Sequence, residues 1–286
     1  MESITAKAIE LETHPVALVW ADEAPAGAVR FKPGRWGCVV NLFAVAATRG
    51  RAGAFDRQTF GCWGGGVGLG FGNQYEDFPG GLGCFCQFLS SGNEQSEQGR
   101  AVGEQIKVSG GGRMADDFLH GERYIKDPES TRRFVEALPM RDIPAGFVVV
   151  KALEQTDPEH DDVKSVTFFV DPDRLSALII LANYAHPDAE NVIVPWAAGC
   201  QVLGIYAYRE LERERPRGLI GLTDISARKN VRSILGEHVL SFTAPWTLFQ
   251  EMESNVKGSF LERETWHSLR KMPSKAYAWS NPRSVR

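Results

Sequence analysis

The second half of the chain alternates between short apolar runs and amphipathic segments, and this alternation restricts the possible folds more than any other feature. Residues 147–150 and 166–170 are β-branched and aromatic runs bounded by polar residues, which predicts two strands. Asp171 and Pro172 then supply an N-cap and a proline at the first helical position. We therefore expect a helix that begins there and runs to about residue 184.

The alternation continues toward the end of the chain. The apolar patterns predict further strands at 191–194, 219–223 and 239–242, and further helices at 198–213, at 226–235 and from 246 onward. Strands that alternate with helices are typical of an α/β architecture. We expect an α/β fold in which helices pack on a mixed sheet.

Glycine separates the 286 residues into two parts of different character. Of the 29 glycines, 22 precede residue 127, together with four of the five cysteines. The first half should therefore be glycine-rich and irregular, with a strand at 14–20 and, at 39–48, either a helix or a buried strand. We expect one large domain, and a division into a Gly/Cys-rich lobe (1–126) and an α/β lobe (127–286) stays open.

The segment 66–72 alternates without exception between glycine and apolar residues. Val67, Leu69 and Phe71 would share one side of a strand, and glycine would occupy the other. Glycine within a strand often marks the close approach of another backbone or a ligand. We therefore interpret this segment as a strand with something flat lying against its bare face.

Charge and hydropathy argue against two classes of partner. The net charge is −4, so there is no electrostatic reason to expect nucleic acid or an anionic membrane surface. Apolar runs such as residues 178–182 are far shorter than the roughly 18 residues that cross a bilayer, and no signal leader opens the sequence. We expect a cytoplasmic protein, whose oligomeric state the sequence does not indicate.

Familiar catalytic and nucleotide-binding motifs are missing from the sequence. The glycine run does not satisfy G-x-G-x-x-G, and the dipeptide Gly-Lys of a phosphate-binding loop does not occur. There is also no G-x-S-x-G nucleophile elbow and no His-x-x-x-His pair. Attention therefore turns to the cysteines.

An odd number of widely spaced cysteines argues against a disulfide framework and for thiols or metal ligands. Thiolate is a soft ligand that suits iron–sulfur clusters and zinc, although no C-x-x-C pair is present. Most of these cysteines follow a glycine, which would let backbone N–H groups approach the sulfur. The candidate glycines are Gly37, Gly61 and Gly199, each directly before a cysteine, and Gly64 and Gly65, which follow Cys62 closely.

Aromatic residues flank the same cysteines and would keep water away from a metal centre. They are Trp36, Phe60, Trp63 and Phe85. The alternative is that the five thiols pack as small hydrophobic side chains in a glycine-rich core.

In chain order, HPVAL, WGC, FGCWGGG, WAAGC, TDISARKNVR and SFTAPW resemble the uncharacterised cysteine-rich family of archaea and bacteria known as domain-of-unknown-function family 169. The resemblance covers most of the chain. It implies that Cys38, Cys62 and Cys200 correspond to the recurring cysteines of the family. Three recurring cysteines are easier to explain as ligands than as core residues, so the resemblance implies a cysteine-ligated iron–sulfur cluster, expected to be 4Fe-4S.

The resemblance leaves the fourth ligand and the reaction open. Cys84 and Cys86 look like additions to the family pattern, and Cys84 is our candidate for the fourth metal ligand. Four thiolates would suggest electron transfer to a redox partner protein, whereas an open iron could act as a Lewis acid on a small-molecule substrate. Cys200 is expected at the start of a helix, where the dipole favours thiolate.

Three further possibilities follow from the residues themselves. The protein could be a metal-free small-molecule binding protein in which the bare face of 66–72 accommodates an organic ligand. Arg228, Lys229 and Arg232 could hold an anion near a strand end, although a solvated helix face is the favoured explanation. The basic, aromatic segment 266–286 could dock a partner.

Overall fold

The computed structural model describes residues 1–110, 112–187 and 189–272. Over these residues, one seven-stranded sheet runs in the order β2-β3-β1-β4-β7-β6-β5. Its strands are β1 (Val16–Ala21), β2 (Gly53–Phe55), β3 (Phe147–Ala152), β4 (Asp162–Val170), β5 (Val192–Ile193), β6 (Gly218–Gly221) and β7 (Leu240–Pro245). Neighbouring strands are antiparallel except β5 and β6, which are parallel. The predicted α/β fold with a mixed sheet is confirmed.

The sheet is the middle layer of the molecule. In β1, Val16 and Leu18 point into one hydrophobic core, whereas Ala17 and Val19 point into a second core on the opposite face. A strand that is buried on both faces reads as a continuous apolar run rather than an alternating one. This is why the run at 14–20 was recognisable as a strand.

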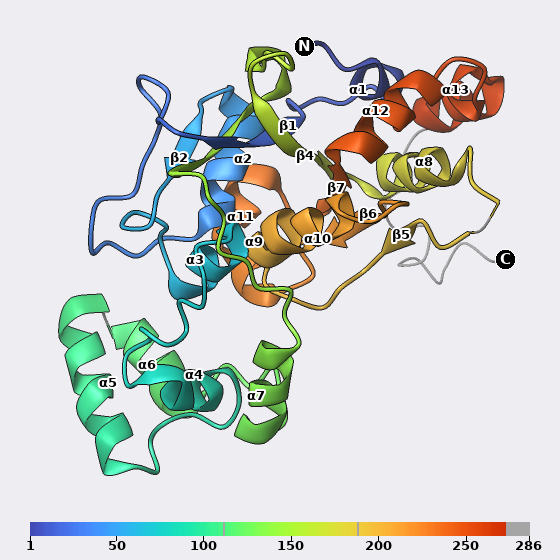
Figure 1. Ribbon diagram of the computed structural model, residues 1–286. Coiled ribbons are helices and arrows are strands. Elements are labelled where there is room, and N and C mark those ends of the chain that lie inside the picture. The colour runs from blue at the N-terminus through green and yellow to red at the C-terminus, as the bar shows by residue number, and fades with distance from the viewer. Residues whose placement is uncertain (111, 188, 273–286) are drawn as a thin grey trace, which may run out of the picture.

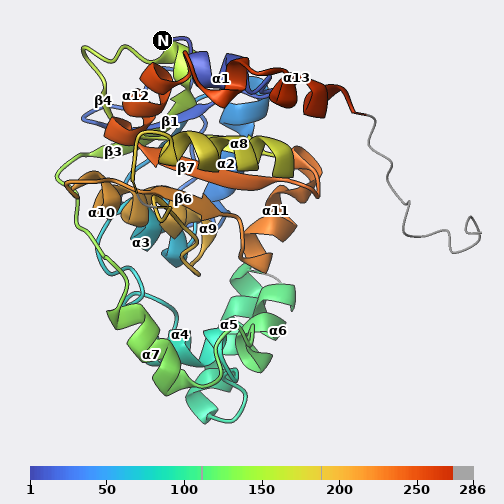
Figure 2. The same cartoon turned by 90° about the vertical axis from the view of Figure 1, so that its right-hand side faces the viewer.

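Helices cover both faces of the sheet (Figures 1 and 2). One face carries α2 (Val39–Arg49), α3 (Trp63–Leu69), α9 (Gly199–Gln201), η2 (Val202–Tyr206), α10 (Ala207–Leu211) and α11 (Ile225–Leu235). The other face carries α1 (Ile4–Ala8), α8 (Pro172–Asn183), α12 (Trp246–Asn255) and α13 (Glu264–Lys271). The short helices η1 (Leu153–Gln155) and η3 (Phe260–Glu262) complete these layers.

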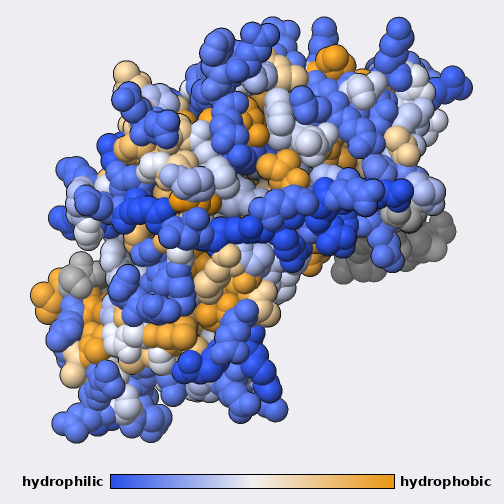
Figure 3. All heavy atoms as spheres, viewed as in Figure 1, coloured by the Kyte–Doolittle hydropathy of each residue, from blue (hydrophilic) through white to orange (hydrophobic). Residues whose placement is uncertain are grey.

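A lobe of helices lies apart from the sheet, at the lower end of the molecule in Figure 1. It consists of α4 (Gly81–Leu89), α5 (Glu97–Gly110), α6 (Gly112–His120) and α7 (Pro128–Glu136). Figure 3 shows apolar side chains gathered on the visible face of this lobe. These helices were not predicted from the sequence. One of them had a local signal, since Asp127 caps α7 by accepting a hydrogen bond from the Ser130 amide at 2.7 Å.

The sheet draws strands from both sides of residue 126. β1 and β2 precede that residue, and both pair with β3, which follows it. A boundary at residue 126 would therefore divide the strands of one sheet between two lobes. Residue 126 itself lies in the connection between α6 and α7.

The second half of the chain follows the predicted alternation closely. The Asp171 side chain caps α8 by accepting a hydrogen bond from the Arg174 amide at 2.8 Å. The predicted helix at 198–213 is one continuous helical segment, in which α9, the π-helical turn η2 and α10 follow one another. The predicted basic segment 266–286 begins inside α13, and its residues 273–286 lie outside the described part of the chain.

The predicted strand at 66–72 is wrong. Residues 63–69 form helix α3, and Gly70 ends it in the left-handed conformation with φ of 93°. Val67 and Leu69 are both buried, because this short helix is enclosed on several sides rather than on one. Strict alternation was therefore a misleading guide to the backbone here.

None of the helices over the described residues is both long enough and apolar enough to cross a membrane.

Candidate functional site

Three cysteines from distant parts of the chain lie at the starts of three helices on the same face of the sheet. Cys38 is the N-cap of α2, Cys62 is the N-cap of α3, and Cys200 is in the first turn of α9. Each of these thiols affects the pKa of another: Cys62 raises that of Cys38, and both raise that of Cys200. All three are free of disulfide bonds. The fold therefore brings them into one site.

Hydrogen bonds tie two of the cysteines to the first turn of α3. The Cys62 sulfur accepts a hydrogen bond from the Gly65 amide at 3.3 Å. The Cys200 thiol donates to the Gly64 carbonyl oxygen at 3.1 Å. The two sulfurs therefore contact the same helical turn, Cys62 as an acceptor and Cys200 as a donor.

The start of a fourth helix completes the site. Asp224 is the N-cap of α11 and accepts hydrogen bonds from the amides of Ala227 and Gly199, both at 2.6 Å. Because Gly199 precedes Cys200, the carboxylate fixes the start of α9 as well as that of α11. A Cβ atom at Gly199 would lie within 3.2 Å of Asp224 and of Val40 in α2. Glycine thus permits the starts of α2, α9 and α11 to meet.

The amides that approach the sulfurs follow the cysteines rather than precede them. The nearby Val40 and Asn41 amides lower the pKa of Cys38, although its side chain accepts no capping hydrogen bond, and the hydrogen bond from the Gly65 amide lowers that of Cys62. Gly37 and Gly61 serve a different purpose, because a Cβ at either would overlap the ring of Phe31. Gly61 has φ of 84°, which also favours glycine.

The bare face predicted for 66–72 is covered by the protein itself. A Cβ atom at Gly68 would lie 2.7 Å from the Cys200 carbonyl carbon. One at Gly204 would lie 2.0 Å from the Gly68 carbonyl oxygen. Another backbone does approach this segment closely, as predicted, and it belongs to the helix that carries Cys200. Gly68 therefore offers no surface to an organic ligand.

Cys84 and Cys86 lie in α4, in the helical lobe. Burial raises the pKa of Cys84 and is its sole cause. Burial also raises the pKa of Cys86, with smaller effects from Arg132 and Glu136 of α7. Neither thiol takes part in the mutual electrostatic effects of Cys38, Cys62 and Cys200. The assignment of Cys84 as a fourth ligand stays a prediction.

The predicted aromatic flanks surround one side of the site. Trp36 packs edge-on against Trp63 with ring centroids 4.2 Å apart, and Trp63 in turn packs against Phe78. Phe85 stacks on Tyr75 at 3.8 Å. Phe60 lies farther along, against Phe71. These rings form a wall along one side of the site, in which Phe78 and Phe85 are buried and Trp36 is exposed.

Two carboxyl groups border the cysteines on another side. Burial raises the pKa of both Asp224 and Glu122, and both carboxylates raise the pKa of Cys62. Ser226 donates a hydrogen bond to Glu122 at 2.7 Å, and its hydroxyl lies 3.1 Å from that of Tyr124. A connected polar group therefore stands beside the thiols, between α11 and the helical lobe.

Burial keeps the three thiols protonated when no metal neutralises them. It raises the pKa of Cys38 to about 12, with a further contribution from Cys62. It also raises the pKa of Cys200 well above the usual value, so the expected stabilisation of thiolate by the helix dipole is outweighed. Thiols of this kind release their protons only when a cation takes their place.

This protonation predicts slow alkylation of Cys38 in metal-free protein. At pH 8 a thiol with a pKa of about 12 should react about 100-fold more slowly than a free cysteine, after allowance for its higher intrinsic nucleophilicity. The rate should still rise with pH at pH 10, where a free cysteine has levelled off. Iodoacetamide labelling followed by mass spectrometry measures this, with guanidinium-unfolded protein as the control. Equal rates in the folded and unfolded protein would contradict it.

Within the described ranges, no three side chains of His, Cys, Asp or Glu are grouped so that they could hold one metal ion. A mononuclear zinc site with Zn–S bonds of about 2.3 Å needs its sulfurs within about 4 Å of one another. A cluster spreads its thiolates over several iron atoms and places them farther apart.

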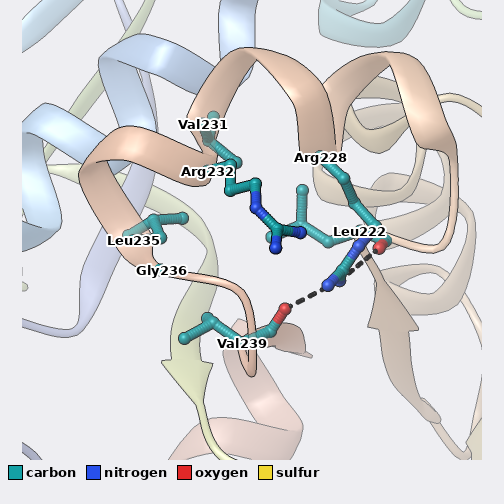
Figure 4. A pocket seen from close by; sticks show the side chains of 7 residues that line it. All are labelled: Leu222, Arg228, Val231, Arg232, Leu235, Gly236 and Val239. Carbon is teal, nitrogen blue, oxygen red and sulfur yellow. Dashed lines mark hydrogen bonds between the residues drawn. The ribbon is translucent and has the colours of Figure 1, made fainter.

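Two of the three basic residues of α11, Arg228 and Arg232, are occupied by other groups. Figure 4 shows Arg228 directed at the Val239 carbonyl oxygen, to which it donates at 2.9 Å; it also donates to Glu237 O at 2.7 Å. Arg232 pairs with the Glu237 carboxylate. The cavity that they line, with a volume of about 10 Å³, has room for one water molecule. The anion site considered for these residues is therefore not supported.

The order and placement of the cysteine motifs agree with a match to a family model over residues 6–255. The chain belongs to the DUF169 family. This family is described as uncharacterised ArCR, so DUF169 membership carries no activity with it. No curated protein and no solved structure matches the chain. The function of this DUF169 protein must therefore be argued from its own residues.

Three residues that surround the thiols in the fold were not predicted from the sequence, namely Asp224, Tyr75 and Glu122. Asp224 carried a visible signal as a helix N-cap, but nothing local indicated that it also binds the start of α9. Tyr75 and Glu122 had no such signal, because they reach the site through the turn after α3 and the connection before α7. Only their positions in the fold identify them.

Proposed function

We propose that this DUF169 protein holds an iron–sulfur cluster, of the 4Fe-4S type, on Cys38, Cys62 and Cys200. The observation that carries the proposal is the convergence of three free thiols at helix starts, with the Gly65 amide donating to the Cys62 sulfur and the Cys200 thiol on the same helical turn. Soft thiolate donors, amide donors to sulfur and an aromatic wall are the features that suit such a cluster.

The chain's own residues have separate roles in this site. Cys38, Cys62 and Cys200 supply the ligands and must lose their protons when they bind metal. The amides of Gly65, Val40 and Asn41 offset the negative charge that remains on sulfur. When bound, the cluster supplies either electron transfer or, where one iron is open, a Lewis acid.

A three-thiolate site is the better supported of the two ligand sets. Cys84 shows no electrostatic link to the other thiols, since burial alone determines its pKa shift. The partly buried carboxyl of Glu122 and the hydroxyl of Ser226 stand beside the site instead, and they could bind or protonate a small-molecule substrate. The partner class is therefore a small oxygen-bearing molecule or a redox protein that docks nearby.

Metal analysis of protein purified without oxygen tests the proposal. We expect about four iron and four sulfide per chain, together with a brown colour, since this is the composition of a cubane cluster. The control is the same protein unfolded in the presence of a chelator, which should lose both. A colourless, iron-free anaerobic preparation that also fails reconstitution with iron and sulfide would contradict the proposal.

A further inference from the structure

Tyr75 is a buried tyrosine whose hydroxyl faces the cysteine site. The residue is 3 % exposed, and its ring is fixed by stacking on Phe85. A Cβ atom at Gly64 would lie 3.6 Å from the Tyr75 hydroxyl and 4.0 Å from the Cys62 sulfur. Cys200 and Cys62 both affect the Tyr75 hydroxyl electrostatically. The hydroxyl is therefore a neighbour of two of the three thiols.

A chain of hydrogen bonds makes the Tyr75 hydroxyl an acceptor from Gln201. The Ala198 amide donates to Gln201 Oε1 at 3.0 Å, which places the amide oxygen of that side chain. Gln201 Nε2 must then be the donor to the Tyr75 hydroxyl oxygen, at 2.7 Å. Because Gln201 uses an acceptor lone pair of the tyrosine, the tyrosine's own proton stays available for another acceptor.

Over the described residues the Tyr75 hydroxyl accepts from Gln201 and donates to no group, and the Cys62 sulfur lies nearby. Burial raises the pKa of Tyr75 well above its usual value, so the hydroxyl keeps its proton. Phe85, which stacks on the Tyr75 ring, offers no strong acceptor of its own. A buried donor without an acceptor would be costly, which favours a partner on the side of Cys62 and Cys200.

We propose that Tyr75, oriented by Gln201, donates a hydrogen bond to sulfur on the Cys62 and Cys200 side of the bound cluster and so sets its reduction potential. This inference rests on the proposed function. A hydrogen bond to sulfur stabilises the more negative, reduced state and therefore raises the potential. Tyr75 is a positioning residue, which needs no change in its own charge to act.

The variant Tyr75→Phe removes the hydroxyl and keeps the ring. We expect it to retain its cluster while the midpoint potential, followed by absorbance or electron paramagnetic resonance in a redox titration, becomes more negative. Tyr208→Phe is the matched control, because Tyr208 is equally buried but donates to the Leu69 carbonyl oxygen at 3.2 Å. Its potential should equal that of the wild type.

The outcomes separate this inference from the proposed function. Wild-type protein that never holds iron overturns the proposed function, and this inference falls with it. A loaded Tyr75→Phe variant with an unchanged potential, or with the same shift as Tyr208→Phe, overturns the inference alone. If Tyr75→Phe holds too little iron to titrate, Gln201→Glu is the second variant. Its carboxylate would accept the tyrosine proton and so remove the hydrogen bond to sulfur. An unchanged midpoint potential in Gln201→Glu would overturn the inference as well.

Discussion

Cys62→Ser and Cys200→Ser should each abolish the visible absorbance of anaerobically purified protein and lower its iron content to below about a tenth of the wild-type value. Both sulfurs contact the first turn of α3, one as an acceptor from Gly65 and one as a donor to Gly64. Serine has almost the same shape as cysteine, but its hydroxyl is a hard and poorly acidic ligand. Loss of the cluster would therefore report on sulfur chemistry rather than on folding.

Cys86→Ser is the matched control for these variants. It exchanges the same atoms at a buried thiol in α4, whose charged neighbours are Arg132 and Glu136. We expect it to retain full colour. Full colour in both Cys62→Ser and Cys200→Ser would contradict the ligand assignment, and loss of colour in Cys84→Ser would add that thiol as the fourth ligand.

Gly204→Ala should destabilise the protein by about 3 kcal/mol, because the added methyl group has no space. Its Cβ would lie 2.0 Å from the Gly68 carbonyl oxygen, a backbone atom that cannot rotate away. The helix that carries Cys200 would have to move away from α3, whose N-cap is Cys62. We therefore expect iron retention to fall together with the free energy of unfolding, measured by denaturant titration of the metal-free and loaded protein.

Gly83→Ala separates this steric effect from the general effect of adding a methyl group to a helix. Gly83 lies inside α4, and a Cβ there would meet nothing within 4 Å. Alanine is the better helix former, so this variant should gain about 0.5–1 kcal/mol. If Gly204→Ala were as stable as Gly83→Ala, the close packing of the two cysteine helices would not be the reason for glycine.

Local signals were sufficient for the second half of the fold. The N-cap at Asp171 and the proline that follows it begin α8 where the sequence indicated. The apolar runs that predicted β3, β4, β6 and β7 are strands in the sheet. These signals work because capping and burial of consecutive apolar residues depend mainly on neighbours in the chain.

The glycine-rich half was harder to predict because its glycines respond to distant backbone. The alternation at 66–72 suggested a strand, yet Gly68 is required by the helix that begins near residue 199. The helices of the lobe at 81–136 were missed for a related reason. Their apolar residues pack against one another, as Phe78 does with Phe85 and Phe118, rather than on a sheet.

The sequence by itself determined the α/β class, most of the strand and helix order in the second half, and the suspicion that cysteines beside glycine share a purpose. Tertiary structure alone decided that residues 38, 62 and 200 meet, and that Tyr75, Glu122 and Asp224 stand around them. The physical reason is that nearby residues specify where a helix starts. Where several helix starts meet depends instead on how closely separate backbones can pack, and no single segment of the sequence determines that.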